Sequence, residues 1–155
     1  DAPTFERMAV KAQDDPLCDW IVMPDVVGDA ASTSVLFDHW VERLGLLDKA
    51  AYVLQDGATT GLVPWGEIDC LFVGGSDSFK ESRRCWELCE MGKAQGKVIH
   101  VGRVNTPRRI VYWHPLADSF DGSGIARFSE QLESCIATMK ELKGTEQMNL
   151  GAWWS

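Results

Sequence analysis

Residues 72–80 read FVGGSDSFK, and this stretch joins an apolar run to a polar one. The run from Cys70 to Val73 has the length and composition of a buried β-strand, and two glycines follow it directly. The polar residues that come next can open a helix. Such a turn can bind a phosphate, bind a flat ring, or serve only as a connection, because backbone amides are exposed where the strand ends.

The rest of the chain repeats this alternation of short apolar runs with longer amphipathic ones, which predicts an α/β fold with a parallel sheet. Strands are expected within residues 19–27, 49–57, 68–76, 96–104 and 116–124. Helices are expected within residues 31–45, 78–96, 105–115 and 126–144. The first helix is expected to be capped by Ser32 or Thr33, and the third by Thr106. The second and fourth helices are expected to end at Gly96 and Gly144.

Composition limits what the chain can be. A chain of 155 residues with 45% hydrophobic residues suits one domain, expected over residues 1–143, with a tail at 144–155. A net charge of −8 speaks against a broad basic surface, so any nucleic-acid contact must be local. Five cysteines without a Cys-x-x-Cys pair indicate a reducing cytoplasm rather than disulfides or a zinc site. Neither a membrane span nor a signal peptide is recognisable, and no metal or cofactor is expected.

Each expected strand ends in polar or glycine residues. These are Asp25, then Gln55 and Asp56, then Gly74 and Gly75, then Gly102 and Arg103, and finally Asp118 and Asp121 around the last strand. A (β/α) barrel builds its active site from all its strand ends, whereas an open doubly wound sheet uses two or three loops at one switch point. The pattern therefore favours a (β/α)8 TIM-type barrel. A whole barrel has eight units in about 250 residues, so we expect only the last five units in this chain.

The ordered series PDVVGD, LQDGAT, FVGGSDSFK, HVGRVNTPRR and ADSFDGSGIAR resembles the motifs of the tRNA-guanine transglycosylase superfamily, including phage and bacterial relatives that insert deazaguanines into DNA. The resemblance covers about residues 20–128. It implies a cytoplasmic enzyme of a bacterium or phage-infected host that replaces guanine by a 7-deazaguanine derivative through a covalent Asp-glycosyl intermediate. DNA is the expected polymer, with tRNA as the alternative. A non-catalytic segment that binds a purine-like base, or a subunit that completes its barrel with another chain, is a further alternative.

The resemblance also implies roles for individual residues. It makes Asp121 the nucleophile, with Asp118 as the neighbouring candidate that could orient it, although both also suit an ordinary turn. It places Asp25 and Gln55 at the edge of the base, where a carboxylate accepts hydrogen bonds and an amide both donates and accepts them.

The opening stretch corresponds to a loop of Gly74, Gly75 and Ser76 that lies against the flat base, since glycine permits close approach. Lys80 does not complete a phosphate-binding motif after these glycines. A local phosphate-binding site is expected to consist of Arg103, Arg108, Arg109 and Arg127. The alternative is that these arginines are ordinary surface charges.

The chain departs from the family pattern in several places. It has no counterpart of the family's acid-base aspartate in an Asp-Ser/Asn-Gly motif, so a site built from these residues alone would lack a partner for its nucleophile. It also has no cysteine-rich zinc motif, and that absence weakens a tRNA assignment. Lys80 stands where the tRNA enzymes carry a glutamate, and Ile99 stands where an aromatic residue lies beneath the base. The identity of the incoming base is therefore open, as is assembly into a homo-oligomer.

Overall fold

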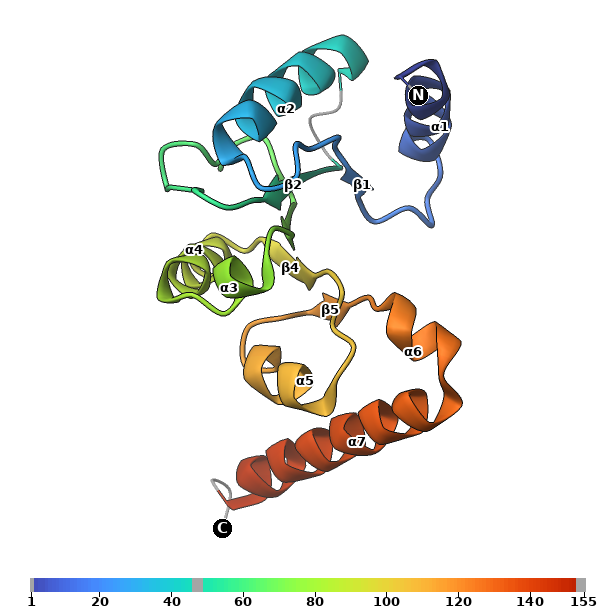
Figure 1. Ribbon diagram of the computed structural model, residues 1–155, viewed down its shortest axis with the longest axis vertical. Helices are drawn as coiled ribbons and strands as arrows, with labels where there is room; N and C mark the ends of the chain where they lie inside the picture. Colours follow the sequence, from blue (N-terminus) through green and yellow to red (C-terminus); the bar gives the residue numbers. More distant parts are fainter. Residues whose placement is uncertain (1, 46–48, 153–155) are drawn as a thin grey trace. The chain divides into compact units, whose positions relative to one another are not determined.

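The computed structural model describes residues 2–45 and 49–152. The chain divides into two compact units, residues 1–100 and residues 101–155, called here the first and second unit. The elements in chain order are α1 (Ala2–Gln13), β1 (Ile21–Val22), α2 (Ala30–Leu44), β2 (Ala50–Leu54), β3 (Cys70–Val73), α3 (Asp77–Lys80), α4 (Arg83–Ala94), β4 (Val98–Val101), α5 (Pro107–Trp113), β5 (Ser119–Phe120), α6 (Ser123–Arg127) and α7 (Ser129–Ala152) (Figure 1).

All five expected strands are present, and they form one parallel sheet in the order β1-β2-β3-β4-β5. Ile21 lies opposite Ala50, and Ala51 lies opposite Cys70. This order contains no reversal of the kind at which a doubly wound sheet binds its ligands. The α/β class is confirmed, and the winding is compatible with part of a β/α barrel, in which each strand also lies beside its neighbours in sequence.

The core of the first unit is built around β2, which is buried over its whole length. Its unbroken apolar run is typical of parallel strands that are covered on both faces. Phe37 of α2 packs edge-on against Tyr52, with ring centroids 5.3 Å apart. On the next strand, Leu71 packs against Gly92 of α4, where an added Cβ would come within 2.6 Å of the leucine side chain.

The start of α2 differs from the prediction. The N-cap is Asp29, whose side chain accepts a hydrogen bond from the Ser32 N–H at 3.0 Å, so the helix begins before Ser32. The Thr33 hydroxyl instead lies buried within the first turn and donates to the Asp29 carbonyl at 2.7 Å. The prediction of a Ser32 or Thr33 cap was wrong because Asp29, about one turn upstream, caps the helix, and both Ser32 and Thr33 lie within its first turn.

The segment expected to form one helix over 78–96 forms two, α3 and α4. Ser82 separates them, because its hydroxyl accepts from the Cys85 N–H and makes Ser82 the N-cap of a new helix. Gly96 follows α4 with a φ of 74°, in agreement with the predicted end. The predicted Thr106 cap of α5 is confirmed, with proline at the first helical positions.

The C-terminal helix also differs from the prediction. Residues 126–144 were expected to form a single helix, whereas α6 ends at Arg127, Phe128 is extended, and α7 then runs to Ala152. The expected stop at Gly144 was wrong because an internal glycine costs a helix only about 1 kcal/mol. No atom lies within 4 Å of the position that a Cβ would occupy there.

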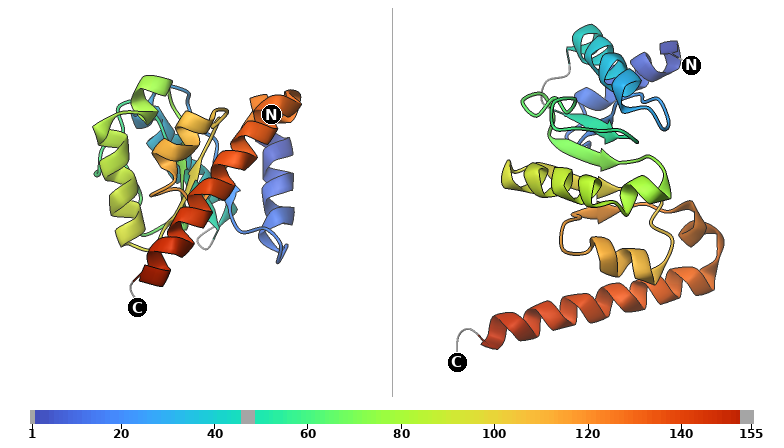
Figure 2. Two further views of the ribbon diagram at one scale, coloured as in Figure 1. Left: turned by 90° about the horizontal axis from the view of Figure 1, so that it is seen from below. Right: turned by 60° about the vertical axis from the view of Figure 1, so that its left-hand side comes forward.

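Helix α1 was not expected from the sequence. It packs on α2 through Phe5, whose ring centroid lies 4.9 Å from that of Trp40, and through an ion pair of Glu6 with Arg43 at 2.8 Å. In the second unit, α5 packs along α7, and α6 contacts α7 at its amino-terminal end (Figure 2). No described helix is both long enough and apolar enough to cross a membrane.

Candidate functional site

The structure brings Asp25 and Gln55 together at the carboxyl ends of β1 and β2. Gln55 is 2% exposed, and its Nε2 donates to Asp25 Oδ2 at 2.5 Å. Its Oε1 accepts from the Gly28 N–H at 2.9 Å. Among the described residues, no second hydrogen bond to the Asp25 carboxylate is found. Gln55 therefore orients Asp25 and the loop that follows β1, and Asp25 Oδ1 is the oxygen that can accept from a ligand.

Gly74, at the end of β3, lies directly beside this pair. A Cβ added at Gly74 would come within 3.0 Å of Gln55 Nε2 and within 2.8 Å of Val53 Cγ1. Gly75 has a φ of 75°, and a Cβ there would meet Asp56 Oδ2 and the Phe79 ring, both at 2.8 Å. Packing within the protein thus requires glycine at both positions, whether or not a flat ring lies above them.

Asp56 organises the same loop, although sequence reasoning gave it no role. Its carboxylate accepts two hydrogen bonds from Ser76, one from the N–H at 2.7 Å and one from the hydroxyl. These bonds, the hydroxyl first, hold the pKa of Asp56 below its ordinary value. The signal that could have identified Asp56 is its position immediately after Gln55 at a strand end. Ser76 therefore directs both of its donors toward the protein, and it also caps α3.

An aromatic cluster lies on the sheet face that carries Gly74. Phe72 precedes Gly74 by two residues and so shares its face. The His100 ring lies 4.8 Å from the Phe72 ring and 4.9 Å from the Trp20 ring. Ile99, by contrast, packs beside Gly92 of α4 on the opposite face. The expectation that Ile99 lies where a base would stack is thus wrong, because strand alternation turns His100 rather than Ile99 toward this face.

Lys80 does not point into solvent after the glycine loop. Its side chain is 4% exposed, and its Nζ lies 3.9 Å from Asp77 Oδ1 on the same short helix. The Lys80 ammonium group, which stands where the tRNA enzymes carry a glutamate, is therefore buried.

In the second unit, Asp121 is exposed at the carboxyl end of β5. Its Oδ1 accepts from the Arg103 N–H at 2.9 Å, and its main chain bonds to Val101 and Val104. Asp118 precedes β5, whereas Asp121 follows it. The two carboxylates thus lie at opposite ends of the strand, and only Asp121 lies at the end where parallel strands bind ligands.

The four candidate arginines all belong to the second unit but come from different elements. Arg103 lies in the loop after β4 and has a left-handed φ of 59°. Arg108 and Arg109 lie in the first turn of α5, and Arg127 is the last residue of α6. Arg103, Arg108 and Arg127 are exposed, as binding to phosphate would require.

Asn105 stabilises the loops around Asp121. Its Oδ1 accepts from the Gly124 N–H at 2.8 Å, and its carbonyl accepts from Gln131 Nε2 at 2.6 Å. A Cβ added at Gly122 would come within 2.5 Å of the Asn105 side chain. The glycine that follows Asp121 is therefore required by the approach of Asn105, a contact that the sequence alone did not indicate.

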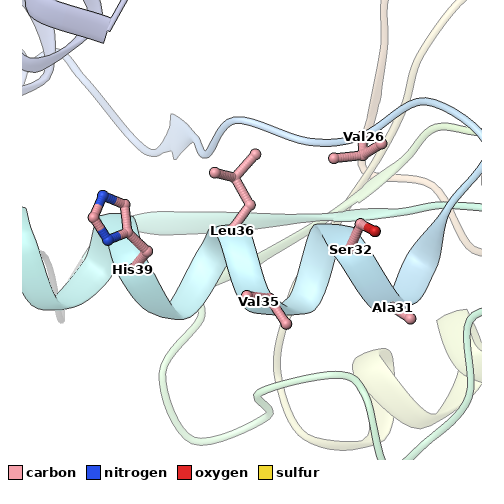
Figure 3. Close-up of a pocket in the computed structure, with 6 residues that line it drawn as sticks. All are labelled: Val26, Ala31, Ser32, Val35, Leu36 and His39. Carbon is pink, nitrogen blue, oxygen red and sulfur yellow. The ribbon is translucent and has the colours of Figure 1, made fainter.

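A mainly apolar groove of about 600 Å³ flanks the loop that carries Asp25. Val26 faces α2 across it (Figure 3). The α2 residues that line the groove are Ala31, Ser32, Val35, Leu36 and His39. Its side chains carry no acid or base except His39, so the groove offers little for base recognition or glycosyl transfer.

Two cysteines of α4 form a buried pair of thiols. Cys85 and Cys89 are buried one turn apart in α4, and their mutual hydrogen bond and burial raise the pKa of the Cys89 thiol. A thiol held protonated in this way is a poor nucleophile. Within the described part of the chain, no group of three or more His, Cys, Asp or Glu side chains could hold a metal ion.

Comparison of the chain with models of protein families, with curated proteins and with solved structures finds no match. A functional assignment therefore has two foundations. One is the ordered series of strand-end motifs, and the other is the local geometry of Asp25 and Gln55 in the first unit and, separately, of Asp121 in the second.

Proposed function

We propose that the chain belongs to a base-exchange glycosyltransferase that replaces guanine by a 7-deazaguanine derivative in nucleic acid, with DNA as the favoured polymer. The observation that carries the proposal is the hydrogen-bonded pair of Asp25 and Gln55 beside Gly74, since it presents a fixed carboxylate at the carboxyl end of a parallel sheet.

Asp25 would read the base. A carboxylate accepts hydrogen bonds only, and the edge of guanine that carries the ring N–H and the amino group only donates. Gln55 would act by holding Asp25, because both ends of its amide are already bound within the protein. The side chains of Phe72 and His100 would supply a flat aromatic surface beneath the base.

Asp121 would supply the nucleophile. One carboxylate oxygen attacks the anomeric carbon, the bond from that carbon to the guanine nitrogen breaks, and the bonding electrons leave with the base. The incoming base then attacks the same carbon and releases Asp121. The proton needed by the leaving base, and lost by the incoming one, must pass through a group other than Asp121. Arg103, Arg108, Arg109 and Arg127 would bind the phosphates.

A second candidate is a protein that binds a purine-like base without catalysis. The observation that favours it is that the Asp25 and Gln55 pair, Gly74 and the aromatic cluster all belong to the first unit, whereas Asp121 belongs to the second. Binding of a base could therefore occur without any contribution from the nucleophile.

Isotopically labelled guanine distinguishes the two candidates. Labelled guanine is incubated with the protein and either duplex DNA or unmodified tRNA, and label in the polymer is counted. We expect label to enter one polymer with the wild-type protein and with Asp118→Asn, which alters the carboxylate at the other end of β5, but not with Asp121→Asn. Guanine binding without exchange into either polymer would favour the binding protein. Absence of guanine binding would contradict both candidates.

A further inference from the structure

The dipeptide Gln55–Asp56 connects the loops on either side of β2. Gln55 binds the loop after β1 through Asp25 and Gly28. Asp56 binds the loop after β3 through two bonds to Ser76, and its carbonyl accepts from the Ala30 N–H at the start of α2, at 3.1 Å. Three consecutive strand ends are thus joined through two adjacent residues.

We propose that Asp56 is a positioning residue of the base site: by holding Ser76 it fixes the Gly74–Gly75 backbone beside the Asp25 and Gln55 pair. This inference rests on the proposed function, and it names a residue to which the family resemblance gives no role. Asp56 acts through the loop and does not contact the base.

The geometry shows why the loop needs such a residue. Gly75 has a left-handed conformation, and Ser76 is exposed and begins a helix of only four residues. So short a helix contributes little stability of its own. The Asp56 carboxylate accepts hydrogen bonds from both donors of Ser76, the N–H and the hydroxyl. Such a two-point, charge-assisted contact restricts the orientation of Ser76 more than a single hydrogen bond would.

The same contact assigns the surface that meets the base. Because the Ser76 N–H and hydroxyl point to Asp56, Ser76 donates nothing to a ligand in this arrangement. The base would instead lie over the backbone at Gly74, next to Gln55. Loss of the Asp56 carboxylate would release Ser76 and allow the loop to turn its amides toward the base.

The test compares guanine binding by three variants of the full chain at pH 7. Asp56→Ala removes both acceptors. Asp56→Asn keeps the shape, since its amide oxygen can accept from the Ser76 N–H and its NH₂ can donate to the Ser76 hydroxyl oxygen. Asp69→Asn is the control, because Asp69 is an exposed carboxylate at the amino end of β3, away from the loop. The Kd for guanine is measured by calorimetry, the Ser76 amide shift by NMR, and folding by thermal melting.

We expect Asp56→Ala to weaken guanine binding about tenfold and to shift the Ser76 amide resonance, because a charge-assisted contact is lost. Asp56→Asn should bind within about threefold of wild type, and Asp69→Asn should match wild type. A folded Asp56→Ala variant with a Kd within twofold of wild type would overturn the positioning role and leave the proposed function intact. Equal losses in the Ala and Asn variants would also overturn it. Failure of the wild-type protein to bind guanine would overturn the proposed function, and the role of Asp56 with it.

Discussion

Substitution of Gly75 by alanine tests whether the loop after β3 is held as the structure describes. Gly57 provides a matched control, because it also has a left-handed backbone, with a φ of 86° against 75° at Gly75. The two sites differ in their surroundings. A Cβ at Gly57 would meet no atom within 4 Å, whereas a Cβ at Gly75 would lie 2.8 Å from both Asp56 Oδ2 and Phe79 Cδ1.

The expected loss in the free energy of unfolding follows, for each variant, from these contacts. A left-handed conformation costs an alanine roughly 1–2 kcal/mol at either position. At Gly75 the new methyl group must also displace the Asp56 carboxylate or the Phe79 ring, and overpacking of this kind costs roughly 1–3 kcal/mol. Movement of the carboxylate would in addition weaken its bonds to Ser76. We therefore expect Gly57→Ala to cost about 1–2 kcal/mol and Gly75→Ala about 2–5 kcal/mol.

The assay is urea unfolding at pH 7, followed by far-UV circular dichroism and by tryptophan fluorescence. Both variants are compared with wild type at the same protein concentration, and the dependence on urea is checked for a change in slope. Equal losses in the two variants, to within about 0.5 kcal/mol, would contradict the close approach of Asp56 and Phe79 to Gly75. A larger loss for Gly57→Ala would contradict it more strongly.

The remaining predictions concern three single side chains, those of Tyr52, Ser82 and Asp56. Tyr52→Phe should change the free energy of unfolding by less than about 1 kcal/mol, because the buried Tyr52 hydroxyl has no hydrogen-bond partner among the described residues. The nearby Ser34 hydroxyl donates to the Leu62 carbonyl instead. Burial raises the pKa of Tyr52 from the ordinary tyrosine value of 10.0 to about 12, so an ultraviolet titration should show this phenol ionising near pH 12. Ser82→Ala should destabilise the protein by about 1 kcal/mol in urea unfolding through loss of the α4 cap, and an unchanged midpoint would contradict that role. The hydrogen bond from the Ser76 hydroxyl is the chief cause that lowers the pKa of Asp56. The contribution of the Asp56 carboxylate to stability is therefore complete above its ordinary pKa of 3.8 and is lost as the pH falls through its lower pKa in the folded protein. Asp56→Asn should therefore reduce the dependence of the unfolding free energy on acid pH, relative to Asp69→Asn.

Sequence patterns predicted much of the local structure. The runs around Tyr52 and Leu71 read as buried parallel strands because both faces of such strands are covered and their composition is apolar throughout. The Thr106 cap and the Gly96 stop were correct since each depends on a few neighbouring residues. The caps at Asp29 and Ser82 were missed because several polar residues lie near each helix start, and local propensity does not rank them.

The pairing of Asp25 with Gln55 was anticipated only in part. Their positions at consecutive strand ends indicated that they would lie at one edge of the sheet, because parallel strands all end at the same edge. Whether Gln55 reads a ligand or holds Asp25 depends on where its amide points, and its burial and its bond to Gly28 became evident only in the folded chain.

The sequence by itself determined the α/β class, the five strands and the residues at their carboxyl ends, because these follow from hydrophobic period and from turn chemistry over short distances. Only the tertiary structure decided that Asp118 lies at the amino end of β5, that Ile99 faces α4, and that Asp56 holds Ser76. The physical reason is that these facts depend on exact strand limits and on contacts between residues up to twenty positions apart. A one-residue shift in strand register turns the side chains of that strand to the other face of the sheet.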